Sequence, residues 1–255
     1  MEALTAADLL DAWEQGASVG AHGRALILLG YARPDLPADS LDEVPIAGRD
    51  AEILRLRRAT FGRRMAAVAP CPACAETLEL DLDAATIQPD ISADLSPEPI
   101  RLSTPRGTVT VRRPTTADLL AAQEVAAAAG SDPMVARRAL RDRLVVRGVA
   151  SAGVVEEETP AETLDPSDLD AAIAAAIEAA EPALDLRLAI SCPSCGHAWE
   201  TTIDVPSFLW TEIVASGQRL ADEVAGLAAA YGWREVDVLA LTPWRRQLYL
   251  DLATG

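Results

Sequence analysis

The sequence predicts a mainly helical α+β fold that contains one small β unit, split between two distant segments of the chain. Three observations support this prediction. Half of the residues are apolar, and alanine supplies much of that half, whereas aromatic residues make up only 4% of the chain. This composition favours closely packed helices. Apolar residues recur at three- and four-residue spacing over most of the chain, as they do on one face of a helix. They alternate with polar residues only in short runs, and the clearest runs flank two pairs of cysteines.

An N-terminal helical region is expected over residues 1–70. Thr5 can cap a first helix, since an acidic residue follows it three positions later. A second helix is expected at 24–31, followed by a proline-bearing loop at 32–48. The apolar spacing predicts a third helix at 50–67, with its apolar face inward and its arginines outward.

Residues 71–82 and 184–205 should together form the β unit. Each segment contains a Cys-Pro-x-Cys turn joined to alternating apolar and polar residues. The alternation covers 78–82 after the first turn, and 184–190 and 199–205 around the second. Such alternation predicts half-buried strands.

Residues 83–183 would then be an insertion carried by this β unit, with acidic, proline-bearing segments at 83–98 and 150–166. A hairpin is expected over 100–111, because turn residues separate two alternating runs. Helices are expected at 115–129, at 132–146 with proline in its first turn, and at 167–180.

A C-terminal helical region is expected over 206–255. Pro206 opens the longest run of helical spacing, and Gly232 ends it. A short helix near 235–240 and a last helix starting at Pro243 should follow.

All four cysteines of the chain lie in the two pairs, Cys71 with Cys74 and Cys192 with Cys195, and 117 residues separate the pairs. A Cys-x-x-Cys turn lets two sulfurs reach one ion, and Zn²⁺ prefers four soft ligands in a tetrahedron. We therefore predict one structural Zn²⁺ in a split zinc-ribbon-like unit. Four sulfurs would leave no open position for a catalytic water.

Two other interpretations of the cysteines remain open. They are four thiols without metal, or a redox-active Cys-x-x-Cys. A redox motif normally precedes a helix, whereas strands are expected after both pairs. His197 follows the second pair and could replace a sulfur, but four cysteines already complete the ligand set. We expect it beside the site or at the surface.

The net charge of −17 opposes binding to nucleic acid. Arginines gather at 49–64 and 137–147, which we interpret as solvated helix faces, with a site for an acidic partner as the alternative. No apolar run reaches the roughly 18 residues of a membrane-spanning helix, and the N-terminus lacks the basic start of a secretory signal. We expect a cytoplasmic protein, whose cysteines bind metal rather than form disulfides.

No motif of a known catalytic type is evident. The two histidines, His22 and His197, lie far apart in sequence, and no glycine-rich phosphate loop connects a strand to a helix. We do not expect an enzyme.

Six of the ten aromatic residues lie within 42 residues near the C-terminus. They can pack the core of the C-terminal helices, or they can form a protein-binding patch, where Trp, Tyr and Arg are enriched. The candidate partner-binding residues are Trp210, Tyr231, Trp233, Trp244, Arg245, Arg246 and Tyr249.

Several short motifs carry a resemblance to a known family. They are Leu9-Leu-Asp-Ala-Trp-Glu14, Arg24-Ala-Leu26, Pro45-Ile-Ala-Gly-Arg-Asp50, Phe61-Gly62, the two Cys-Pro-x-Cys pairs, Phe208-Leu-Trp-Thr-Glu-Ile213, Tyr231-Gly-Trp233, Arg245-Arg246 and Tyr249-Leu250. With these motifs the chain resembles the actinobacterial proteins grouped with the T-even-phage-type baseplate hub assembly chaperones, found beside genes of phage-tail-like contractile injection systems. The resemblance covers most of the chain and is weakest over 83–183. One departure is Ala75, where a zinc ribbon often has glycine.

The resemblance implies a non-enzymatic role in assembling the central hub of a contractile baseplate, and no catalytic residues carry over. The leading hypothesis is an assembly factor or minor baseplate component that binds baseplate or hub proteins through its helical C-terminus, or also through the basic 137–147 helix. The second is a zinc-ribbon protein that binds nucleic acid or regulates. The third is a redox- or metal-sensing protein.

Overall fold

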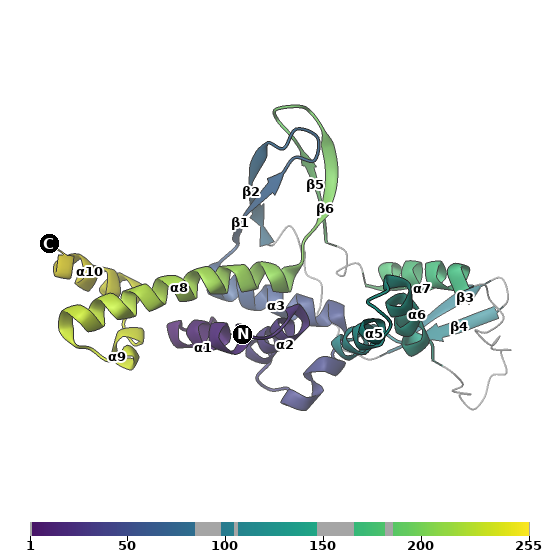
Figure 1. Cartoon of the computed structure of the whole chain (residues 1–255), viewed down its shortest axis with the longest axis horizontal. Helices are drawn as coiled ribbons and strands as arrows, with labels where there is room; N and C mark the ends of the chain where they lie inside the picture. The colour runs from purple at the N-terminus through teal and green to yellow at the C-terminus, as the bar shows by residue number, and fades with distance from the viewer. Residues whose placement is uncertain (1, 85–97, 105–106, 147–165, 182–185, 255) are drawn as a thin grey trace.

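Long helices and separate two-stranded hairpins build the mainly helical α+β fold that the sequence predicts (Figure 1). In this computed structural model, two hairpins rise together from the middle of a row of helices, with the insertion at one end of the row and the C-terminal helices at the other. The structure describes residues 2–84, 98–104, 107–146, 166–181 and 186–254.

The N-terminal helices form largely as the sequence predicts. The first helix starts after Thr5, whose side chain accepts a bond from the amide of Asp8 (3.1 Å) while the Asp8 carboxylate accepts one from the amide of Thr5 (2.8 Å). This capping box satisfies two amides that the helix leaves unpaired. The elements are α1 (Ala6–Gly16), α2 (Ala21–Ala32), a short 3₁₀ helix η1 (Ala38–Glu43) and α3 (Ile46–Phe61).

The predicted boundaries of the third helix are wrong at both ends. The helix starts at Ile46 and stops at Phe61, because Gly62 follows with a φ of 82°. Residues 64–67, predicted as helix, belong to strand β1 (Arg64–Pro70). Met65 still points into the core, but from this strand.

The arginines of α3 were predicted to face outward, and for Arg49 and Arg57 this is wrong. Their exposed fractions are 5% and 2%. Arg57 pairs with Glu212 (2.5 Å) and donates to the carbonyls of Gly62 and Arg64 (2.8 and 2.6 Å). The guanidinium can be buried because a carboxylate and two carbonyls satisfy its donors.

The two cysteine-bearing hairpins are separate antiparallel sheets. Strand β1 pairs with β2 (Thr77–Asp83), and β5 (Arg187–Ser191) pairs with β6 (Ala198–Thr202). The strand predicted at 199–205 is shorter than expected, since the next helix already begins at Val205 with Asp204 as its N-cap.

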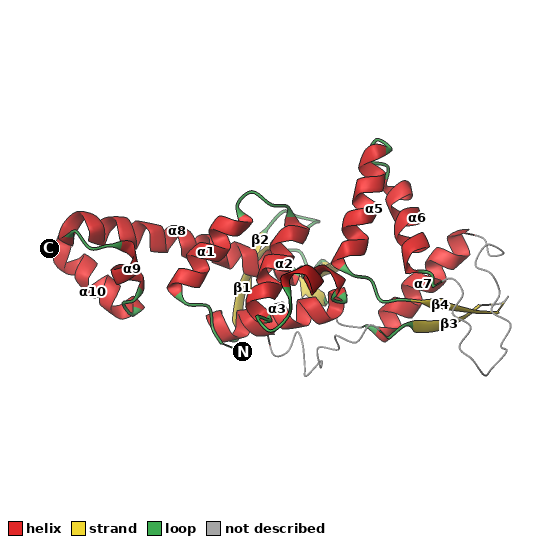
Figure 2. Cartoon of the chain, turned by 90° about the horizontal axis from the view of Figure 1, so that it is seen from below, coloured by secondary structure: helices red, strands yellow, loops and turns green. Residues whose placement is uncertain are grey.

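The insertion has its own small apolar core. Its elements are β3 (Ile100–Thr104), β4 (Gly107–Val111), α5 (Thr116–Ala128), α6 (Pro133–Leu144) and α7 (Pro166–Ala180), and Figure 2 shows α5 and α6 projecting together. Buried residues from both strands, α6 and α7 form this core: Leu102, Val109, Val111, Leu144, Leu169 and Ile173. Most of the predicted linkers, and two residues of the predicted turn at 105–107, lie outside the described residues.

A buried carboxylate holds the insertion's helices to its hairpin. Asp118 is paired with Arg112 and Arg143 and accepts a bond from the amide of Thr115 (3.1 Å). Burial raises the pKa of Asp118, but the bonds from these three residues outweigh it and hold the pKa below its usual range. The carboxylate is therefore ionised wherever the protein is folded near neutral pH.

The C-terminal region starts with the long helix α8 (Val205–Tyr231), which ends at Gly232 as predicted; this glycine has a left-handed conformation. Two short helices follow, α9 (Glu235–Leu239) and α10 (Pro243–Thr254). None of the described helices combines the length and the apolar character that crossing a membrane requires.

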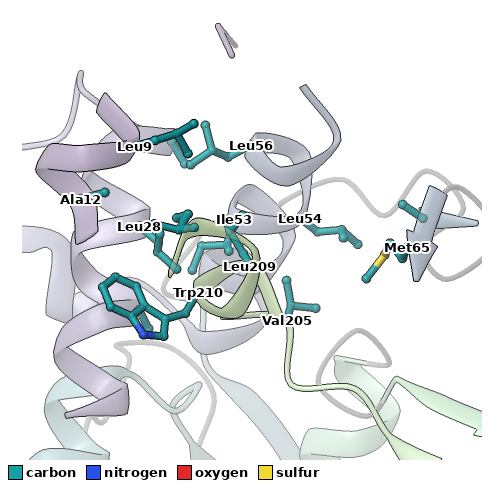
Figure 3. Close-up of a cluster of buried hydrophobic side chains, with 14 of the residues drawn as sticks. Leu9, Ala12, Leu28, Ile53, Leu54, Leu56, Met65, Val205, Leu209 and Trp210 are labelled. Carbon is teal, nitrogen blue, oxygen red and sulfur yellow. The ribbon is translucent and has the colours of Figure 1, made fainter. Parts of the chain in front are cut away.

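The main core lies between α1, α2, α3 and the first half of α8 (Figure 3). Helices α1 and α8 approach closely through glycine. A Cβ at Gly16 would lie 2.2 Å from the Trp210 ring, and a Cβ at Gly217 would lie 2.5 Å from the Trp13 ring. Each indole thus occupies the space that a side chain would fill on the facing helix. These two contacts hold α8 closely against α1.

Candidate metal centre

The first hairpin closes through a tight turn between β1 and β2. The amide of Cys71 donates to the carbonyl of Glu76 (2.8 Å), and the amide of Ala75 donates to the carbonyl of Cys71 (2.9 Å). Ala75 has a φ of 59°. This left-handed conformation turns the chain sharply enough for both cysteines of the turn to face the same point.

The second hairpin repeats this turn. The amide of Cys192 donates to the carbonyl of His197 (2.8 Å), and the amide of Gly196 donates to the carbonyl of Cys192 (2.9 Å). Gly196 has a φ of 73°, at the position equivalent to Ala75. Glycine adopts this conformation at no steric cost, whereas an L-residue pays roughly 1–2 kcal/mol.

The two turns bring all four predicted ligands together. The Sγ atoms of Cys71 and Cys195 lie 3.7 Å apart, as do those of Cys74 and Cys192. All four sulfurs lie within 4.8 Å of one another. A sulfur tetrahedron around Zn²⁺, with bonds of about 2.3 Å, has edges of about 3.8 Å. The cluster therefore fits a tetrahedral ion.

The cluster is half enclosed. Cys71 and Cys192, the first cysteine of each pair, have exposed fractions of 2% each, while Cys74 and Cys195 are exposed. Beneath the sulfurs, apolar side chains from both hairpins form a small shared core that comprises Leu78, Ile190, Ala69, Leu80, Leu188 and Trp199. Among the strands that the structure describes, no hydrogen bonds join these two sheets, so the hairpins meet through this core and the sulfurs.

Ionising all four thiols is unfavourable without a cation. Burial raises the pKa of Cys192, but bonds from the backbone amides of Cys195 and Ser194 and from neighbouring thiols lower it to about 7. The amide of Glu76 lowers the pKa of Cys74, but bonds with the other three sulfurs, together with burial, raise it to about 12. One thiol thus ionises near neutral pH while another keeps its proton, and a bound cation would remove this conflict.

His197 lies beside the site and is not part of the sulfur cluster. Its exposed ring stacks on Trp199, with ring centroids 5.9 Å apart and planes at 17°. Within the described parts of the chain, the four cysteines are the only group of His, Cys, Asp and Glu side chains close enough to hold a metal ion.

The candidate partner-binding residues fall into two groups. Trp210 and Arg246 are buried, with exposed fractions of 8% and 4%. The Trp210 ring lies in the main core under the guanidinium of Arg24 (4.7 Å), and Arg246 pairs with Glu223 (2.6 Å). Neither side chain is accessible to a partner in this structure.

The other five residues gather at the far end of α8. Tyr231 stacks on Trp233 with centroids 4.9 Å apart, and Tyr249 packs edge-on against Trp233 at 5.0 Å. Trp244 is 71% exposed, and Arg245 beside it is also exposed. The structure thus places an aromatic surface on this end of the molecule.

Comparisons with protein-family models, with curated proteins and with solved structures find no match to this chain. Function is therefore inferred from the residues and their geometry.

Most arginines of the two basic clusters are paired with carboxylates. In the first cluster Arg63 pairs with Asp83 and Arg64 with Asp81, both at 2.6 Å. In the second, α6 places Arg137 and Arg141 against Asp170, a residue of α7 (3.2 and 3.3 Å). Their positive charge is largely balanced by the protein itself.

Sequence reasoning missed Leu248 and Leu252 on α10, which are 37% and 66% exposed and share a helix face with Trp244. Their four-residue spacing was visible in the sequence. It could not show which face of the helix packs on the protein.

Proposed function

We propose that this chain is a non-enzymatic, protein-binding factor that helps to assemble the baseplate hub of a phage-tail-like contractile particle, or is a minor component of it. We further propose that it carries one structural Zn²⁺ on Cys71, Cys74, Cys192 and Cys195, and that it acts in the cytoplasm, where thiols stay reduced. The observation that supports the proposal most is the convergence of the four sulfurs within 4.8 Å, because four thiolates around one ion would leave no open position for a catalytic water.

Zinc is favoured by the chemistry and the spacing of the donors. Four thiolates select soft or borderline ions, and a tetrahedron of sulfurs is typical of zinc or of iron–sulfur sites. A single ion fits sulfur separations of 3.7 Å, and Cys-x-x-Cys turns on two hairpins are the usual zinc-ribbon arrangement. The ion would join the two hairpins and do no chemistry.

A protein partner is favoured by the C-terminal end of the molecule. Trp, Tyr and Arg side chains are enriched at the energetic centres of interfaces, and this end presents Tyr231, Trp233, Trp244, Arg245 and Tyr249 together. The assignment to a baseplate hub rests on the motif resemblance described above.

Nucleic acid is the less favoured partner. The chain has a net charge of −17, and carboxylates of the protein pair most arginines of both basic clusters. Binding to a polyanion requires basic groups that are free to replace its counterions.

Two measurements test the proposal. Elemental analysis of the reduced, purified chain should find one zinc per chain, and a chelator should increase hydrogen exchange in β1, β2, β5 and β6. Absence of zinc from material purified in a zinc-containing medium would refute the metal assignment.

Separately, the purified hub protein of the same particle should bind the chain, and binding to duplex DNA or RNA instead would overturn the assignment to a hub.

A further inference from the structure

Helix α10 packs on α8 through one face only. On that face Arg246 pairs with Glu223 (2.6 Å), and a Leu250 methyl group lies so close to Gly226 that a Cβ there would be 2.8 Å from it. These contacts fix how the helix is rotated, and so determine which residues face away.

The opposite face of α10 carries a row of apolar side chains. Trp244, Leu248 and Leu252 are 71%, 37% and 66% exposed. Residues four apart lie one above another on a helix, so the three form a strip about 12 Å long. Spacing of this kind is how an amphipathic helix engages an apolar groove on another protein.

Arg245 lies beside this apolar strip and places a positive charge on its flank. Its side chain is exposed, and no carboxylate of the described residues lies within ion-pair distance of it. The adjacent Arg246 is buried and paired. A surface complementary to the strip would therefore place a carboxylate opposite Arg245.

An antiparallel pairing of α10 with the α10 of a second copy is a poor match to the strip. An antiparallel pair of α10 helices related by a twofold axis at Leu248 would bring the two Arg245 side chains to one flank. It would bring the two Asp251 side chains to the other flank. Like charges placed together disfavour such a pair.

We propose that α10 inserts the strip formed by Trp244, Leu248 and Leu252 into an apolar groove of a partner protein, with a carboxylate on the rim of the groove facing Arg245. The proposal rests on the proposed function in that it assigns the partner chemistry of the same C-terminal end. It identifies α10 as the inserted element and the partner as the owner of the groove.

Photo-crosslinking in the full-length chain tests the location. A photoreactive residue at Leu248 should form an adduct with the hub protein, in cells that produce the particle. The same residue at Val68, which is 67% exposed on β1, is the matched control and should form none. Mass spectrometry then identifies the partner segment, which should line an apolar groove with a carboxylate at its rim.

Affinity measurements with the purified hub protein test the chemistry. Leu248→Asp should weaken binding by at least about tenfold, as expected for a central apolar anchor, while Val68→Asp leaves it unchanged. Arg245→Glu should also weaken binding, and replacing the mapped partner carboxylate with lysine should restore it. Circular dichroism checks that each variant is folded.

The outcomes separate this proposal from the proposed function. Equal binding of the hub protein to the wild-type chain and to Leu248→Asp overturns the α10 proposal and leaves the hub assignment standing. A different result is that Leu248 crosslinks into an acidic-rimmed groove of a protein other than the hub, and that exchanging the charges of Arg245 and the partner carboxylate restores binding. That result overturns the hub assignment and supports the proposal that α10 is the inserted element. A crosslink only to a second copy, or none at all, overturns the α10 proposal.

Discussion

The two cysteine turns have the same backbone geometry but different residues at the position that requires a positive φ. Both have the same pair of backbone bonds and one buried and one exposed cysteine. The first uses Ala75 at φ 59° and the second Gly196 at φ 73°. The four-sulfur arrangement thus demands one conformation from both turns, and the first turn adopts it with a residue that disfavours it.

The largest expected effect comes from the buried sulfurs. Cys71→Ser and Cys192→Ser remove equivalent ligands, so each should lower zinc affinity by more than about 100-fold, the upper end for losing a residue that only supports a ligand. Competition with a chromophoric chelator measures this. Ser194→Ala, in the same turn as Cys192, should bind zinc normally. If one cysteine proves dispensable, the two turns are not equivalent.

The shared core beneath the sulfurs should respond equally from both sides. Leu78 and Ile190 are each 7% exposed. Leu78→Ala and Ile190→Ala should each cost about 2–4 kcal/mol of stability, because both leave a cavity. Thermal unfolding of the zinc-loaded protein measures the cost. The control Val68→Ala, at a site 67% exposed on β1, should change little. A cost confined to one hairpin would show that the hairpins do not share a core.

Exchanging the residues at the positive-φ positions should change stability by smaller amounts of opposite sign. Ala75→Gly relieves a strained backbone and should stabilise the protein by up to about 1 kcal/mol, after the entropy that glycine adds to the unfolded chain. Gly196→Ala should destabilise by about 1 kcal/mol. No neighbouring atom lies within 4 Å of the Cβ that would be added at Gly196, so the expected cost comes only from the strained backbone conformation. Shifts of the same sign in thermal midpoint would contradict this explanation.

The smallest effect is expected from the residues that follow the turns. His197→Ala loses one ring stack, worth about 0.5 kcal/mol because the His197 ring is exposed, and Glu76→Ala at the equivalent position loses none. Both variants should keep one zinc per chain by elemental analysis. Loss of zinc from His197→Ala alone would mean that the ligand set includes the imidazole.

Local signals in the sequence predicted those parts of the fold that depend on neighbouring residues. The cap at Thr5, the end of the long helix at Gly232 and the Cys-x-x-Cys turns each depend on a few adjacent positions, and all three form. The four-sulfur cluster was also predictable, because two Cys-x-x-Cys turns flanked by strands are typical of a four-cysteine metal site.

Features that depend on distant partners were not predictable. Residues 64–67 were predicted as helix because Met65 continues the helical spacing of the apolar residues before it; pairing of β1 with β2 overrides that pattern. The burial of Arg57 depends on Glu212, which is 155 residues away. The free face of α10 follows from contacts with α8 that the periodicity does not reveal.

The distance between the two sulfur pairs has a consequence for synthesis of the protein on the ribosome. Cys74 and Cys192 are 118 positions apart, so the first pair leaves the exit tunnel long before its counterpart has been translated. Closing a loop of that length costs on the order of 4 kcal/mol in chain entropy. The nascent polypeptide must therefore hold its first two thiols uncommitted, exposed to stray ions and to oxidation, until the second turn emerges.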